Sequence, residues 1–381
     1  MVDDSQVEET DRFFNWFYKP NQVGKRRSEA LANELNNMNT NVKIDVVDGS
    51  LIPESLIKKY NIFILTDCYS IQLVEGYDQL CRTNNVAFII ANCIGTLGSI
   101  FVDFGENHRI EDKYHSSRKQ QYFVKHITNE RPGKVELHNL GKASGFQTGD
   151  YVCFSGVEGM SQVNGNEPRP IKVIDENSFT IEPTLSFDKY AGGGVVTYEK
   201  VPTKLAFKSF KQAWTAGKMK SEVNSNNTLT QLEYHICMMI YYELREEHEV
   251  SVSLLVDTLS DKNFDEVFEE IIITRPLIKN LYDRTAKRKQ LIYKLMTHLL
   301  YARGQQLVPV SMIIANYVSI QLICLTGKLT PIHQFAYFDA SDSLSDDFIG
   351  CLGYEEKDLL SYHFESHKLT KPGIIDFENQ K

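Results

Sequence analysis

The residues that could do chemistry in this chain are few, and their spacing completes no site. A phosphate-binding loop needs glycines that open a helix, because the N–H groups at a helix N-terminus receive the anion. The chain has no G-x-G-x-x-G, and Gly95 and Gly98 precede a predicted strand, Ile100 to Phe104, instead of a helix. We therefore interpret both glycines as structural and predict no catalytic and no cofactor-binding residue.

Cysteine and histidine spacing argues against a zinc site and against a disulfide framework. The seven cysteines include no C-x-x-C pair, which is typical of a reducing compartment. Among the ten histidines, His363 and His367 have helical spacing, but they lie in a polar tail and we interpret them as a chance pair. No metal site is predicted.

Composition restricts the partners. The 381 residues suggest two or three domains, at roughly 150 residues each. The net charge of -9 argues against nucleic acid, since excess Lys and Arg bind phosphate backbones, but it leaves a basic protein partner open. The acidic start, Met1 to Asp11, does not resemble a signal peptide. These features predict a cytoplasmic chain, with the nucleus left open.

One apolar segment, residues 309–327, raises the question of a membrane. Asn316, Ser319 and Gln321 interrupt it, and its uninterrupted apolar stretches fall short of the ~20 residues that a span needs. We predict a buried core helix that ends at Gly327, and no membrane partner.

The first hundred residues alternate between two periodicities. Helical spacing covers residues 28–37 and 73–84, and strands are predicted at 42–47, 62–65 and 86–91. The last two strands are continuous apolar runs, typical of a parallel sheet covered on both faces. This alternation predicts part of a doubly wound, Rossmann-like α/β domain.

The middle of the chain has short strands and then helices. After a polar entry loop at 108–120, strands are predicted at 121–127, 134–137, 151–155, 171–174, 178–181 and 195–198. Such closely spaced strands predict a small antiparallel β-barrel. Apolar residues then recur at helical spacing within 205–214, 229–240, 264–272 and 291–300. These four stripes predict a four-helix bundle.

A resemblance to a known family is strongest from Asp150 to Asn166, continued by Ile171 to Val173 and Gly192 to Val196. These residues look like the first catalytic-cysteine half-domain of the ubiquitin-activating enzymes, which adenylate ubiquitin and begin its conjugation. The catalytic cysteine of that family lies in another domain. Cys153 is therefore not its counterpart.

Three more segments resemble the same family. Val23 to Ala30 is similar to the inactive adenylation domain, residues 92–106 to the Phe-x-Asp-Phe-Gly-Glu strand before the inserted barrel, and Lys328 to Ala340 to the returning Pro-Ile and Tyr-Phe-Asp-Ala sequences. The resemblance implies an α/β domain without its first strand and helix, interrupted by a barrel and a bundle. The implied segments are 1–108 (α/β, first part), 109–202 (barrel), 203–304 (bundle), 305–345 (α/β, returning part) and 346–381 (tail).

One departure distinguishes this chain from the active adenylation domain of the family. Phe14 stands where that domain has a phosphate-handling Arg, and Arg12 lies two places too early. A guanidinium is needed there because its bidentate donors neutralise charge that develops during adenylyl transfer. The resemblance therefore implies the inactive domain, and we interpret Lys25 to Arg27 as a solvated helix start.

The resemblance implies a non-catalytic half that binds ubiquitin or a ubiquitin-like protein and scaffolds an active adenylation half, in cis or in trans. ATP and magnesium are then expected only in that active half. Glu158, Gln162 and Asn164 are the candidate ubiquitin contacts by position in the matching motif, with turn chemistry as the alternative for each. A degenerate fragment, or a scaffold protein without activating function, is the alternative for the whole chain.

Overall fold

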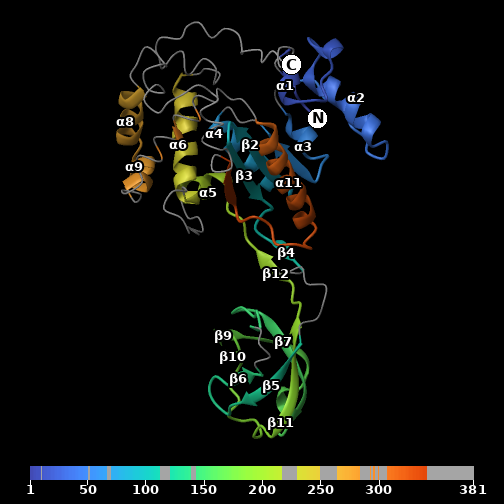
Figure 1. Ribbon diagram of the computed structural model, residues 1–381, viewed down its shortest axis with the longest axis vertical. Coiled ribbons are helices and arrows are strands. Elements are labelled where there is room, and N and C mark those ends of the chain that lie inside the picture. Colours follow the sequence, from blue (N-terminus) through green and yellow to red (C-terminus); the bar gives the residue numbers. More distant parts are fainter. Residues whose placement is uncertain are drawn as a thin grey trace, which may run out of the picture. The chain divides into compact units, whose positions relative to one another are not determined.

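The computed structural model forms two compact units (Figure 1). Unit 1 contains Met1–Gly105, Phe207–Gln321 and the described residues from Ile332 on, and unit 2 contains Glu106–Ala206 and Leu322–Pro331. The structure describes residues 1–9, 11–49, 52–66, 70–111, 121–138, 143–216, 230–248, 264–283, 292, 295, 296, 299 and 307–340.

The sheet of unit 1 is mixed. Its order is β1-β2-β3-β13, where β1 is Ile62–Leu65, β2 is Ala87–Ile94, β3 is Leu97–Asp103 and β13 is Phe335–Asp339. β1 and β2 are parallel and joined through helix α4 (Ile71–Thr83), as predicted. β3 is antiparallel to both β2 and β13, so the sheet is antiparallel beyond the predicted parallel pair. β3 runs antiparallel to β2 because the turn at Gly95 returns the chain without a crossover helix.

The predicted strand at 42–47 is wrong: no strand is assigned there. The N-terminus of Met1 donates to the Asp45 carbonyl at 2.8 Å, and the Val47 N–H donates to the Met1 carbonyl at 3.0 Å. These two bonds pair the segment with one residue only, so no ladder forms. The predicted helix at 28–37 is confirmed as α2 (Arg27–Met38); two short helices lie beside it in sequence, α1 (Asp11–Phe14) and α3 (Glu54–Ile57).

Helices complete the core of unit 1. They are α5 (Phe210–Ala216), α6 (Gln231–His248), α8 (Phe264–Thr274), α9 (Pro276–Asp283) and α11 (Val308–Leu325). α6 packs on β13 and on α8 and α9, so strands and helices share one apolar cluster. The predicted fourth stripe is represented by the buried side chains of Ile292, Leu295, Met296 and Leu299. The remainder of 284–306 lies outside the described residues, and the four-helix bundle stays a prediction.

Unit 2 is built on a seven-stranded antiparallel sheet of order β8-β7-β11-β5-β6-β10-β9. The strands are β5 (Gln121–Ile127), β6 (Lys134–Leu137), β7 (Tyr151–Glu158), β8 (Gly165–Pro170), β9 (Lys172–Asp175), β10 (Ser178–Thr180) and β11 (Gly192–Glu199). β8 and β9 lie at opposite ends of this order, yet only Ile171 separates them in sequence. The sheet must therefore curl around the apolar cluster of this unit.

A short ribbon accompanies the entry and exit of unit 2. β4 (His108–Ile110) pairs antiparallel with β12 (Thr203–Leu205). The predicted entry loop at 108–120 is thus corrected at its start, because its first three residues are a strand with a partner far along the chain. Residues 112–120 lie outside the described residues.

Candidate functional site

The three predicted contact residues lie close in sequence in unit 2, where β7 ends and the chain turns toward β8. Glu158 is the last residue of β7, Gln162 lies in the 3-10 helix η2 (Ser161–Val163), and Asn164 follows it. Met160 and Val163 are fully buried in the core of unit 2, and the side chains of Glu158 and Gln162 are exposed. Hydrophobic anchoring of the turn therefore positions its polar side chains.

Asn164 is used by the fold itself. Its side-chain oxygen accepts a hydrogen bond from the Val157 N–H at 2.9 Å, and its side-chain nitrogen donates to the Val157 carbonyl at 2.8 Å. These two bonds attach the turn to β7 in the way that a neighbouring strand would. The geometry therefore favours turn chemistry for this residue.

Gln162 joins the turn to a second loop. Its Nε2 donates to Asp188 Oδ2 at 2.7 Å, and its Oε1 accepts from the Asp188 N–H at 3.3 Å. Arg169 donates to the Gln162 backbone carbonyl at 2.9 Å. The pairing brings Asp188, which the sequence prediction did not include, beside the predicted residues.

Glu158 supplies an exposed charge next to that pair. Its backbone carbonyl accepts from the Ala191 N–H at 2.9 Å, so the same two loops meet here. Burial raises the pKa of the Tyr190 phenol, and the Glu158 carboxylate adds to the rise. We call Glu158, Gln162 and Asp188 the acidic loop surface. It offers acceptor oxygens to a basic partner.

In unit 1 the glycines that could suggest a phosphate loop serve a hairpin. Gly95 has φ +55° in the turn between β2 and β3, and Gly98 pairs with Cys93 across that hairpin. A Cβ on Gly98 would lie 2.5 Å from the side chain of Ile314 in α11. A strand follows these glycines, so no helix N-terminus faces an anion. They do not fit a nucleotide phosphate site.

The basic side chains at the start of α2 are already paired. Arg27 donates to both carboxylate oxygens of Asp11, at 2.8 and 2.7 Å. Arg26 forms ion pairs with Asp48, with Asp4 and with Glu29. Carboxylates thus compensate both guanidinium groups, and a phosphate would have to displace them. The predicted solvated helix start is therefore an ion-paired one.

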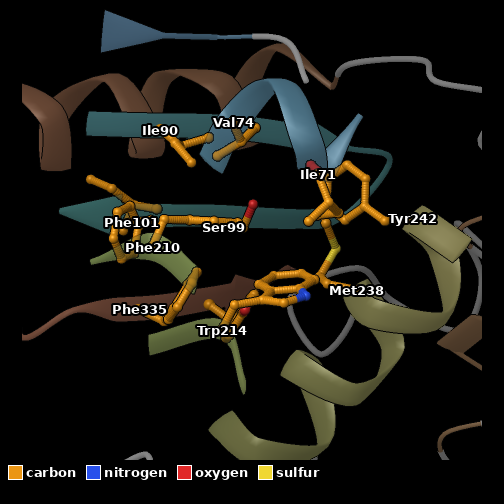
Figure 2. Close-up of a pocket in the computed structure, with 12 residues that line it drawn as sticks. Ile71, Val74, Ile90, Ser99, Phe101, Phe210, Trp214, Met238, Tyr242 and Phe335 are labelled. Atoms are coloured by element: carbon orange, nitrogen blue, oxygen red, sulfur yellow. The ribbon is translucent and has the colours of Figure 1, made fainter. Parts of the chain in front are cut away.

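A small cavity lies against the sheet of unit 1 (Figure 2). Its volume is about 20 Å³, room for roughly one water molecule and far below that of a nucleotide. Figure 2 shows apolar and aromatic side chains converging on it from the strands and from α4, α5 and α6. The lining residues are Ile71, Val74, Ile90, Ser99, Ile100, Phe101, Phe210, Trp214, Met238, Tyr242, Phe335 and Tyr337. We interpret the cavity as a packing defect.

Helix α11 is apolar on two faces. Val310 and Ile314 are buried against β2, whereas Met312 is 68% and Ile323 is 49% exposed. It has the length and composition of a membrane span, and 22% of its residues are buried inside the protein. The predicted buried core helix is therefore buried on one face only.

Metal chemistry has no visible basis in the part of the chain that the structure describes. Within it, no group of three His, Cys, Asp or Glu side chains could hold a metal ion. Among the described residues, Cys81, Cys93, Cys237 and Cys324 are free thiols. His363 and His367 lie outside the described residues.

Comparison with known proteins finds similarity to one family. Residues 130–200 match the family described as Ubiquitin-activating enzyme E1 FCCH domain. Over 350 residues the chain is 26% identical to Ubiquitin-like modifier-activating enzyme 1 of Mus musculus. The aligned residues make up 91% of this chain and 32% of the mouse protein. Over 91% of its length this chain is therefore similar to a ubiquitin-activating enzyme. Its identity to Ubiquitin-like modifier-activating enzyme 1 of Dictyostelium discoideum is 28% over 373 residues, which covers 97% of this chain and 35% of that protein.

The chain spans about a third of the length of these ubiquitin-activating relatives. Among solved structures, "Crystal structure of E. coli MccB + SeMet MccA" is similar over 27% of this chain and 32% of that chain, with 17% identity and a TM-score of 0.24.

Sequence reasoning missed the buried polar side chains of Asp78 and His235 in unit 1. Asp78 in α4 is 1% exposed, and His235 in α6 is fully buried. Both lie in helices, and the sequence pattern of these helices does not distinguish them from ordinary helix positions. Asp103, beside Asp78, was visible in the Phe-x-Asp-Phe-Gly-Glu motif, but only as a strand residue.

Proposed function

We propose that this chain is the non-catalytic half of a ubiquitin-activating enzyme. In this proposal unit 2 binds ubiquitin or a ubiquitin-like protein, and unit 1 scaffolds an active adenylation half, in cis or in trans. That active half would hold ATP and magnesium, because Gly95 and Gly98 form a hairpin and Arg26 and Arg27 are paired with carboxylates. The free cysteines suit the cytoplasm or the nucleus.

The observation that supports the scaffold role is the outer face of α11. We define the α11 outer face as Val308, Met312, Ile320 and Ile323, which are 37%, 68%, 36% and 49% exposed. Their spacing of four, eight and three residues places them on one side of the helix. The whole helix contains no charged residue. A solvent-facing helix side normally carries charges, so this one fits a protein partner.

A bilayer fits the α11 outer face less well than a protein does. The opposite side of the helix packs closely on the sheet, where Gly98 admits Ile314. Asn316 and Ser319 are exposed polar residues in the middle of the helix. The helix could leave the sheet for a membrane only by exposing Val310 and Ile314 and by taking those polar groups into lipid.

The test of the scaffold role is ATP–pyrophosphate exchange in the presence of ubiquitin. The full chain is assayed alone and then mixed with a C-terminal half that carries an active adenylation domain. We expect exchange in the mixture only. The double variant Met312→Glu/Ile320→Glu should weaken the association about tenfold or more, because it would bury two carboxylates. Ile273→Glu, at a 64% exposed position of α8, is the matched control and should bind normally.

Ubiquitin binding is tested separately on the acidic loop surface. Glu158→Lys should slow association with ubiquitin at low salt, because complementary charge acts mainly on the association rate. Glu167→Lys makes the same charge change at an exposed position of β8 and is the control. Equal association rates for the two variants would show that Glu158 is not part of the contact with ubiquitin.

The outcomes separate the alternatives. Exchange by the chain alone would overturn the non-catalytic reading. Cosedimentation with lipid vesicles that the Met312→Glu/Ile320→Glu variant abolishes would assign the α11 outer face to a membrane. If the chain bound neither ubiquitin nor the active half, the remaining interpretations would be a degenerate fragment or a scaffold protein that has no activating function.

A further inference from the structure

A buried pair of acids lies in unit 1, apart from the surfaces discussed above. Asp78 in α4 and Asp103 at the end of β3 are each 1% exposed. Arg82, one turn after Asp78, forms an ion pair with Asp103 at 2.5 Å. The cluster therefore contains two carboxyl groups and a single guanidinium, and the second carboxyl has no matching positive charge.

The hydrogen bonds of Asp78 leave one oxygen unpaired. Its Oδ2 accepts from the Phe210 N–H at 2.8 Å, and its Oδ1 is buried without a partner among the described residues. The neighbouring Asp103 carboxyl also interacts with the Asp78 carboxyl, both through its charge and through a side-chain hydrogen bond. Two ionised carboxylates can only accept, so a hydrogen bond between them needs a proton on one. Burial, with the Asp103 charge in addition, raises the pKa of Asp78 to about 7.

The other titratable groups around the pair do not compete for this proton. Arg82 is bonded to Asp103, and burial raises the pKa of Asp78 by more than the Arg82 charge lowers it. Burial raises the pKa of Cys81 to about 12, with the Asp78 and Asp103 charges adding to the rise, so its thiol stays neutral. Between α4 and α5, Glu75 pairs with Lys211 at 3.1 Å, where Lys211 is exposed.

The acid pair also holds the two segments by which the chain leaves unit 1 and returns to it. Before the exit, the Gly105 N–H donates to Asp103 at 2.7 Å. At the return, Arg82 donates to the Phe207 carbonyl at 3.3 Å and Asp78 accepts from the Phe210 N–H. The Phe207 N–H donates to the Gly105 carbonyl at 3.0 Å and so joins the two segments.

We propose that Asp78 and Asp103 form a proton-dependent clamp on residues 103–105 and 207–210. The clamp is closed while the two carboxyl groups share one proton, and it loosens when both are ionised. Near neutral pH a rise in pH removes the shared proton and leaves two like charges buried side by side. The two segments therefore become less protected as the pH rises from about 6 to 8.

Hydrogen exchange on the full chain tests this clamp. After correction for the intrinsic rate, the peptide that covers 205–212 should open at least about tenfold more readily at pH 8 than at pH 6. Asp78→Asn replaces the shared proton with an amide that donates to Asp103, so its protection should stay high at both pH values. Glu75→Gln removes an acid from the same helix outside the clamp and should keep the wild-type dependence.

A second measurement keeps the test decisive if Asp78→Asn fails to fold. The carboxyl carbon of Asp78 in the wild-type chain, followed by carbon NMR, should titrate near neutral pH. Titration near the ordinary pKa of an aspartate would overturn the proposal. So would pH-independent exchange of residues 205–212, or an Asp78→Asn variant whose exchange still follows pH.

Discussion

Asn164 is a predicted ubiquitin contact whose side chain is also hydrogen-bonded within the fold. A substitution at this residue can tell the two roles apart. Asn164→Ala removes both hydrogen bonds to Val157, and we expect the free energy of unfolding to fall by about 2 kcal/mol. Urea unfolding followed by far-UV circular dichroism measures this. Asn164→Asp keeps the acceptor and should lose about half as much. A stable Asn164→Ala variant that no longer binds ubiquitin would instead make Asn164 a contact residue.

His235 is a buried base whose protonation state follows from its partners. Its Nε2 lies 2.9 Å from the Trp214 carbonyl and its Nδ1 lies 2.7 Å from the Tyr337 hydroxyl. A carbonyl only accepts, so Nε2 carries the proton and Nδ1 accepts from Tyr337. The ring is therefore neutral, and burial lowers its pKa to about 4.

That lowered pKa predicts acid sensitivity of unit 1. Below about pH 6.5 the unfolded chain gains a proton on His235 that the folded chain does not. Stability is therefore lost as the pH falls from 6.5 to about 4, approaching ~3 kcal/mol. Urea unfolding between pH 4.5 and 7 measures the slope. His235→Phe should be less stable at pH 7, because it leaves Trp214 and Tyr337 unpaired, and should have a flatter slope; an unchanged slope would contradict the assignment.

The residues that sequence reasoning missed owe their character to distant partners. Asp78 accepts its hydrogen bond from Phe210, 132 residues away, and His235 is bonded to Tyr337, 102 residues away. In the sequence each occupies one more position of a helix. Burial and pKa at such positions arise from tertiary packing, which local periodicity does not contain.

At the level of elements, the regular strands were predictable and the irregular ones were not. The predicted strands at 121–127 and 134–137 match β5 and β6. β8 was missed, because Gly-Asn-Glu-Pro-Arg-Pro is typical of a turn. It forms at the end of the sheet order, where a proline without an N–H is tolerated. The opposite error at 42–47 has the same origin, since a strand needs a partner as well as a pattern.

The packing of α11 on the hairpin gives an element-scale prediction. Gly98→Ala should lower the free energy of unfolding by about 1–3 kcal/mol, because its Cβ would lie 2.5 Å from Ile314. Ile314→Ala also destabilises, through a cavity. The double variant should cost clearly less than the sum of both changes, since the new methyl group then has room. Additive losses in urea unfolding would show that α11 does not press on Gly98.

At the scale of the whole molecule, the two units have separate cores, and their optical probes are separate too. Both tryptophans of the chain, Trp16 and Trp214, lie in unit 1. Trp214 is 8% exposed in the core that contains Phe101 and Tyr242. Tryptophan fluorescence therefore follows the unfolding of unit 1, whereas the β signal of circular dichroism includes the curled sheet of unit 2.

This separation predicts the effect of a core change in each unit. Phe154 is 1% exposed in unit 2, and Phe154→Ala should cost that unit about 3–5 kcal/mol. The circular dichroism transition should shift to lower urea while the fluorescence midpoint stays in place. Ile240→Ala, at a fully buried position of α6, is the matched control and should shift the fluorescence midpoint. If Phe154→Ala shifted both signals together, the units would unfold as one, because only a cooperative connection could transmit the loss from unit 2 to Trp214.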